Sequence, residues 1–171
     1  MTTTDAVELE APRFETGPAL VIAGLRGHFT MATANGIPAQ WQRFVSIGRV
    51  PGKIGAVEYG LCFPMPGGFD YMCGVEISSV VGLPGEFSQT TIPAQPYAVF
   101  AHREHVSKLR NTLDNIWHKW FPSSCYKHVE PSGGAPAFFE RYGERFNPQT
   151  GMGDVEIWMP VQHSKERTTN E

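Results

Sequence analysis

Residues 153–161 read GDVEIWMPV, and this stretch decides the fold prediction. Side chains of a β-strand alternate between its two faces, so the apolar ones here share one face: Val155, Ile157 and Met159. Glu156 and Trp158 then point to the other face. A similar stretch, CGVEISSVV, occurs earlier at residues 73–81 and carries Glu76. Two strand-like stretches with the same Val-Glu-Ile motif indicate an internal duplication.

The elements predicted around the two motifs follow the same order in each half. The first half is predicted to contain a strand at 19–27, a helix at 34–47 and strands at 56–65 and 69–78. The second half is predicted to contain a strand at 97–102, a helix at 105–120 that Pro122 ends, and strands at 137–142 and 154–161. Both halves therefore read as β-α-β-β.

These elements predict an α+β fold, in which a tandem β-α-β-β duplication forms an antiparallel sheet with helices on one side. An aromatic cleft is expected on the other side. The domain is predicted to span residues 14–161, with halves at about 14–82 and 83–161. Residues 1–13 and 162–171 are polar and lack periodicity, and both are expected to be flexible tails.

Composition argues against several classes of function. The chain has 14 Lys and Arg against 17 Asp and Glu and no concentrated basic stretch, so direct nucleic-acid binding is not expected. No apolar run approaches the roughly 20 residues of a membrane span, and no secretion signal is apparent, so a cytoplasmic location is expected. Cys62, Cys73 and Cys125 lack metal-ligand spacing, and the HREH stretch at 102–105 is interpreted as a helix cap. Neither a metal nor a cofactor is expected.

The last two predicted strands bring rings and carboxylates together. In the stretch AFFERY, Phe138, Glu140 and Tyr142 share a face. If this strand pairs antiparallel with the last one, these residues join Glu156 and Trp158 on one surface. Ring faces attract cations, with roughly 0.5–2 kcal/mol for each contact, and a carboxylate among apolar groups needs a positive partner or a proton. A lipophilic cation meets both demands. The alternative is a solvated face on which the glutamates pair with nearby arginines.

Other rings are assigned from their spacing. Trp41 and Trp117 fall on the apolar stripes of the predicted helices, so core packing is expected for both. In the first hairpin, Tyr71 alternates with other aromatic residues and is included among the candidate ligand-binding residues because it can close the far side of a cleft.

Several stretches together resemble the GyrI-like small-molecule-binding family: FDYMCGVEI, TIPAQPYAVFAHRE, LDNIWHKWFPSSCY and FFERYGERFNPQTGMGDVEIWMPV. The resemblance covers about residues 14–161 and extends to the effector-binding domains of AraC- and MerR-type multidrug regulators. It implies two SHS2-like halves with a ligand cleft between them, and a buried acid framed by rings that binds lipophilic cations. Glu156 is the best match for that acid and Glu140 the second. Trp158 and Tyr142 are carried over as its ring partners, and Phe138 and Tyr71 join them as candidates from their places on the predicted strands.

Three functions stay open at this point. The first is binding of lipophilic, often cationic, small molecules for sensing or sequestration. The second, implied by stand-alone family members, is hydrolysis of lipophilic electrophiles such as cyclopropane-bearing DNA alkylators, with Glu156 and Tyr142 as catalytic residues. The third is a protein-interaction module of the gyrase-inhibitor kind. Residues 1–13 are too short for a helix-turn-helix, so the chain itself is not expected to act as a transcription factor.

Overall fold

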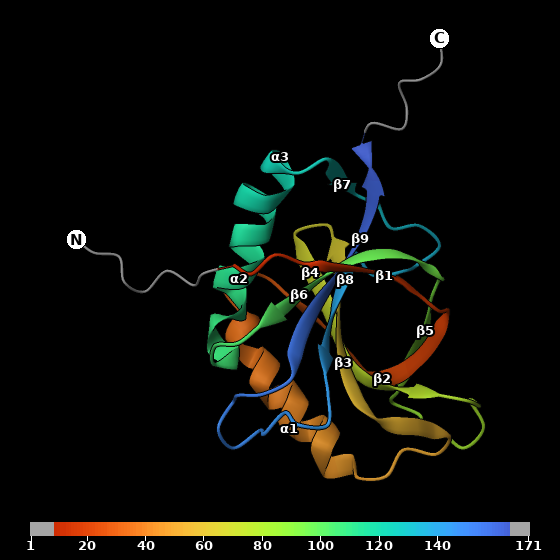
Figure 1. The fold of residues 1–171 in the computed structure, drawn as a ribbon. Helices are drawn as coiled ribbons and strands as arrows, with labels where there is room; N and C mark the ends of the chain where they lie inside the picture. Colours follow the sequence, from red (N-terminus) through yellow and green to blue (C-terminus); the bar gives the residue numbers. More distant parts are fainter. Residues whose placement is uncertain (1–8, 165–171) are drawn as a thin grey trace.

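The computed structural model of the protein describes residues 9–164. The first unit contains β2 (Leu20–Phe29), α1 (Ile37–Ile47), β3 (Lys53–Met65) and β4 (Gly68–Ile77). The second unit contains β6 (Gln95–His102), α2 (Leu109–Asn115), β8 (Phe138–Tyr142) and β9 (Val155–His163). Three more strands of the described residues lie outside this repeat: β1 (Arg13–Gly17), β5 (Ser88–Ile92) and β7 (Tyr126–His128). The predicted tandem β-α-β-β order is confirmed (Figure 1).

The sheet order reveals how the two units are joined. The strands run β1-β6-β9-β8-β3-β4-β2-β5, and β7 pairs with β9. β1 precedes the first unit but pairs with β6 of the second, while β5 precedes the second unit but pairs with β2 of the first. Each unit thus covers the edge of the other, which ties the halves into one body. Sequence analysis missed these two strands because each has only five residues and a largely polar, half-exposed pattern.

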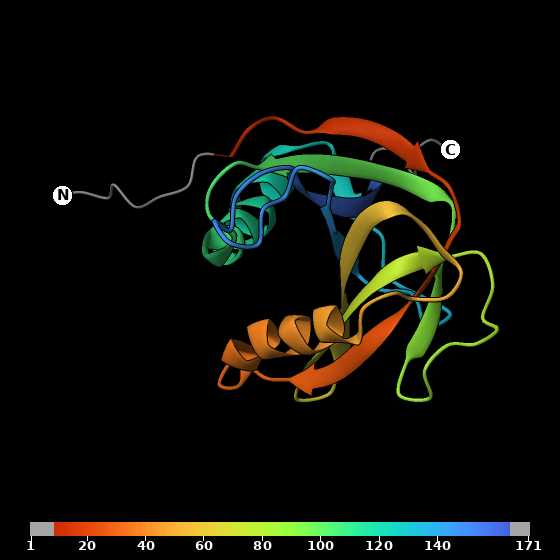
Figure 2. The same cartoon turned by 90° about the horizontal axis from the view of Figure 1, so that it is seen from below.

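The sheet has an apolar core on each of its two faces. α1 and α2 lie on the same side of the curled sheet (Figures 1 and 2), and the two clusters beneath them share Trp41 as a packing partner. Rings and aliphatic side chains fill the opposite face: Ile22, Tyr59, Leu61, Phe63, Met72, Ile92, Tyr97, Val99, Phe139 and Trp158. These rings pack on one another, with Phe139 stacked on Trp158 at 5.6 Å between centroids, so this face forms a core.

The helix expected at 105–120 is longer and less regular than predicted. A 3₁₀ turn, η2 (Val106–Lys108), precedes α2, which continues through a π-helical segment, η3 (Ile116–Trp120), into α3 (Phe121–Ser123). Pro122 was predicted to end the helix, and the helix does end one residue later, at Ser123. The interpretation of HREH as a cap is confirmed, because His105 Nδ1 accepts from the Ser107 backbone N–H at 3.0 Å.

The chain ends are only partly described. β1 begins at Arg13, and β9 continues to His163, within the tail that was predicted from residue 162. The rest of the two predicted tails, residues 1–8 and 165–171, lies outside the described residues. Within the described part of the chain, no helix has the length and apolar character needed to cross a membrane.

Candidate functional site

The register between β8 and β9 decides which side chains share a surface. Glu140 lies opposite Ile157, and Arg141 lies opposite Glu156. Because paired residues of antiparallel strands point the same way, Glu140 faces the helices and Glu156 faces the opposite core. The predicted common surface was therefore wrong. Its residues separate into two sets: Phe138, Glu140 and Tyr142 on the helix side, and Glu156 and Trp158 on the other.

Glu156 already has positive partners. Arg13 Nη1 donates to Glu156 Oε2 at 2.8 Å, and Arg141 Nη1 lies 3.9 Å from Oε1. Trp158 Nε1 donates to Oε1 at 2.9 Å. Burial raises the pKa of Glu156, but the hydrogen bonds from Arg13 and Trp158 and the charges of the two arginines outweigh burial and lower it. A carboxylate that is neutralised in this way has little need of a cationic ligand.

Replacing Arg13 by Ala is expected to remove the closer of the two arginines from Glu156 and leave the fold intact. The Arg13 side chain is 49% exposed, and exposed ion pairs contribute only about 0–1 kcal/mol. The free energy of unfolding, measured by urea denaturation, should therefore fall by less than about 1 kcal/mol. A loss several times larger would mean that Arg13 is a principal anchor of β1.

Glu140 differs from Glu156 in both burial and partners. The residue is 8% exposed, and its Oε1 accepts hydrogen bonds from Tyr71 Oη at 2.7 Å and Tyr142 Oη at 2.8 Å. None of the ion pairs among residues 9–164 involves Glu140. The carboxylate is therefore held by two neutral phenols, and no positive charge among the described residues pairs with it.

Gly60 makes room for this hydrogen-bonded group. It lies opposite Glu140 in β8 and opposite Cys73 in β4, at the centre of the sheet. A Cβ atom at this position would lie 2.1 Å from Tyr71 Oη and 2.6 Å from Glu140 Oε1. The glycine therefore lets a tyrosine of the first unit reach a glutamate of the second.

Replacing Gly60 by Ala is expected to push Tyr71 away from Glu140 and to destabilise the protein by about 1–3 kcal/mol, as overpacking in a core does. Gly85→Ala is the matched control, because a Cβ there meets nothing within 4 Å. Chemical denaturation of both variants measures the difference. Equal stabilities would show that the phenol and the carboxylate move aside without cost.

Aromatic rings surround the two tyrosines. Trp41 Nε1, on α1, donates to Tyr71 Oη at 3.1 Å. The Trp41 ring meets the Tyr142 ring edge-on at 5.4 Å, and Tyr142 also meets Phe146 at 5.0 Å. Phe138 packs in the same cluster as Tyr142. Of the six expected site residues, the structure thus brings Glu140, Tyr71, Tyr142 and Phe138 to one side of the sheet.

Burial controls the ionisation of this cluster. It raises the pKa of Glu140, and the two phenol hydrogen bonds offset this only in part. Burial and the charge of Glu140 raise the pKa of Tyr71 and Tyr142 well above normal, so both phenols keep the protons that they donate. Burial, and then the charge of Glu140, raises the pKa of Cys62 to about 12, so its thiol is no nucleophile at neutral pH. A cation bound beside Glu140 would stabilise the ionised carboxylate that burial disfavours.

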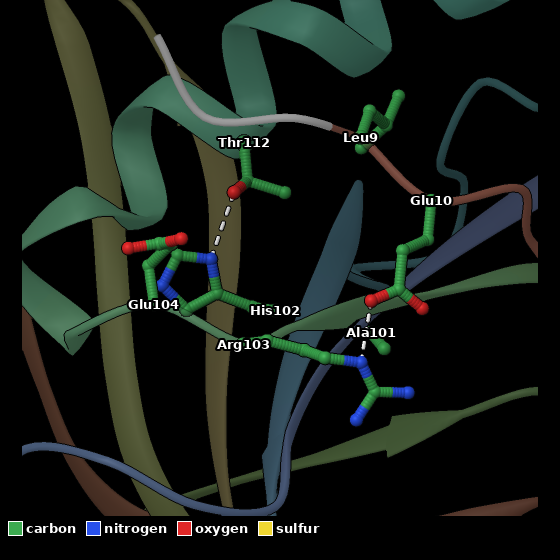
Figure 3. Close-up of a pocket in the computed structure, with 7 residues that line it drawn as sticks. All are labelled: Leu9, Glu10, Ala101, His102, Arg103, Glu104 and Thr112. Atoms are coloured by element: carbon green, nitrogen blue, oxygen red, sulfur yellow. Dashed lines mark hydrogen bonds and ion pairs between the residues drawn. The ribbon is translucent and has the colours of Figure 1, made fainter. Parts of the chain in front are cut away.

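Two cavities lie elsewhere. One of about 300 Å³ is lined by Leu9, Glu10, Ala101, His102, Arg103, Glu104 and Thr112 (Figure 3). In it, His102 is already bonded to Thr112 and Arg103 to Glu10. Another of about 390 Å³ is lined by Arg26, Gln89, Thr90, Thr91, Gly133 and Gly134. Neither includes Glu140. The described residues contain no cluster of side chains suited to a metal ion.

Comparison with known proteins agrees with this architecture. Residues 10–162 match the GyrI-like small molecule binding domain. The chain belongs to this family. The GyrI-like domain is 28% identical over 148 residues to the transcriptional regulator BrlR of Pseudomonas aeruginosa. The aligned residues make up 84% of this chain and 53% of BrlR. The chain therefore spans about half the length of that regulator.

Solved structures share the fold of this GyrI-like domain. SAV2435 bound to tetraphenylphosphonium superposes with a TM-score of 0.70 at 21% identity, covering 95% of this chain and all of that one. The EcmrR–DNA complex superposes with a TM-score of 0.62 at 16% identity, covering 91% of this chain and 58% of that one. That this GyrI-like domain does not bind nucleic acid directly stays a prediction.

Two residues of the GyrI-like domain were not predicted at the site. Trp41 was assigned to the core from its helical spacing, and it does pack there, but its N–H also reaches Tyr71. Gly60 was not singled out, because the role of a strand glycine becomes clear only once its cross-strand neighbours are known. A glycine in the interior of a predicted strand was the one available hint.

Proposed function

We propose that this GyrI-like domain binds lipophilic organic cations, with the Glu140 carboxylate as the counter-charge. The observation that carries the proposal is a buried carboxylate without a positive partner among the described residues. Isolating a charge from water is costly unless it is paired. A cationic ligand would supply the missing charge, and the pairing would contribute favourably to its binding free energy.

The surrounding residues define the class of ligand. Tyr142, Trp41 and Phe138 offer apolar ring surface, and ring faces attract cations. A strongly hydrated ion such as Na⁺ gains little from contact with apolar rings. A cation whose charge is shielded by hydrocarbon groups can contact both the rings and the carboxylate. Tetraphenylphosphonium, the ligand of the structural neighbour SAV2435, is a suitable probe.

A pair of probes with the same shape and opposite charge tests the proposal. Tetraphenylphosphonium and tetraphenylborate present four phenyl rings around a central atom and differ in sign. We expect isothermal titration to show binding of the phosphonium and at least about tenfold weaker binding of the borate. Equal affinities would mean that the charge of Glu140 plays no part and would overturn the proposal.

Hydrolysis is a second candidate, favoured by the contact between Glu140 and Tyr142. Their 2.8 Å hydrogen bond joins an acid of raised pKa to a phenol, a suitable pair for general acid–base chemistry. Incubation with cyclopropane-bearing compounds, followed by mass spectrometry for a product with one added water, tests this function. Product that persists in Glu140→Gln would exclude this pair as its source.

A further inference from the structure

The indole of Trp41 contacts both tyrosines that hold Glu140. Its Nε1 satisfies the Tyr71 hydroxyl at 3.1 Å, and its ring lies edge-on against Tyr142 at 5.4 Å. Tyr71 is 4% and Tyr142 is 7% exposed, so a bulky ligand reaches Glu140 only when side chains above it move. Any such ligand must replace the contacts that the indole gives up.

Gln40, the residue before Trp41, holds the helix against the sheet. Its Nε2 donates to the backbone carbonyls of Leu25 at 3.1 Å and Tyr71 at 3.0 Å, and so links α1 to β2 and β4. The glycine at position 27 permits this close approach, because a Cβ there would lie 2.5 Å from Gln40 Oε1. Gln40 therefore fixes the height of Trp41 above the site.

α1 also packs on the sheet through Ile37, Trp41, Phe44 and Ile47. Phe44 is its only fully buried side chain, although the helix runs from Ile37 to Ile47. The helix ends at Gly48, whose φ of 85° is a left-handed conformation that glycine adopts without strain. Because all of these side chains but Phe44 are only partly buried, α1 is suited to shift when a ligand enters.

We infer that Trp41 is a specificity-determining residue of this site, and that Gln40 is the positioning residue that sets its selectivity. This inference rests on the proposed function. Only a cation with enough aromatic surface to replace the indole contacts displaces Trp41. A small quaternary ammonium ion such as tetraethylammonium matches the charge of Glu140 but offers no ring for this exchange.

The test compares the affinities of two cations in the full chain. Wild type is expected to prefer tetraphenylphosphonium to tetraethylammonium. Trp41→Ala should reduce this preference at least about tenfold, because tetraethylammonium then enters without having to displace an indole whose ring contacts it cannot replace. An unchanged preference in Trp41→Ala, together with loss of phosphonium binding in Glu140→Gln, would overturn this inference and leave the proposed function standing. Absence of phosphonium binding in wild type would overturn the proposed function itself.

Gln40→Leu provides a second test that leaves Trp41 in place. It removes both hydrogen bonds to the strands, so the amides of α1 should exchange faster with deuterium and the preference should fall by about threefold. Gln42→Leu, at an exposed position of the same helix, is the matched control and should change neither quantity. Equal behaviour of the two variants would overturn the role of Gln40. If Trp41→Ala does not fold, the comparison of Gln40→Leu with Gln42→Leu decides the inference.

Discussion

Replacing Glu140 by Gln is expected to weaken tetraphenylphosphonium binding about tenfold to hundredfold, since hydrogen bonds and contacts to a desolvated charge contribute roughly 1.5–3 kcal/mol. The amide keeps the size of the carboxyl group and an oxygen that can accept from Tyr71 and Tyr142. The variant therefore removes the charge and little else. Isothermal titration of wild type and variant at neutral pH measures the ratio.

Glu156→Gln is the matched control for this experiment. Glu156 is paired with Arg13 and lies on the opposite face of the sheet, so its replacement should change the affinity by less than about threefold. The sequence ranks Glu156 first as the ligand-binding acid, and the two variants compare that ranking directly with the geometry. A large loss in Glu156→Gln and none in Glu140→Gln would restore Glu156 to the central role.

Replacing Glu140 by Gln is also expected to stabilise the unliganded protein at alkaline pH. Burial raises the folded-state pKa of Glu140 above its ordinary value of 4.5. The folded state therefore binds this proton more tightly than the unfolded state. As the pH rises from about 4.5 through the folded-state pKa, wild type loses this contribution, whereas Glu140→Gln does not. Near pH 8 the variant should be more stable by about 1–3 kcal/mol, the ordinary cost of an imperfectly compensated buried group.

Urea denaturation of both proteins across this pH range isolates Glu140, because every other titrating group is common to them. Phosphonium affinity should rise with pH over the same window in wild type and stay flat in the variant, since only the ionised carboxylate neutralises the cation. Parallel stability curves would show that the burial of Glu140 does not disfavour its charge.

The fold was predictable because its signals are local. The alternation in GDVEIWMPV correctly places Val155 and Ile157 on the helix side and Trp158 on the other. The spacing of apolar residues within 34–47 correctly predicts α1, and the Val-Glu-Ile motifs fall in β4 and β9, the last strands of the two units. The edge strands β1 and β5 escaped detection because they are short and largely polar, and their pairing across the two halves leaves no local signal.

The site depended on information that the sequence does not hold locally. Residues 143–154 separate β8 from β9, and a connection of that length does not fix the register between two strands. A shift of one residue moves every side chain of a strand to the other face. The structure pairs Glu140 with Ile157, so the two glutamates that were expected together lie on opposite sides of the sheet.

The sequence by itself determined the repeated elements, the apolar face of each and the short list of acidic and aromatic residues that included Glu140, Tyr71, Tyr142 and Phe138. Only the tertiary structure decided which glutamate is buried without a cation, and that Gly60 and Trp41 belong beside it. Periodicity is a property of one segment and can be read from the sequence of that segment alone. Register and burial arise between segments, because they depend on how distant strands align when the chain closes on itself.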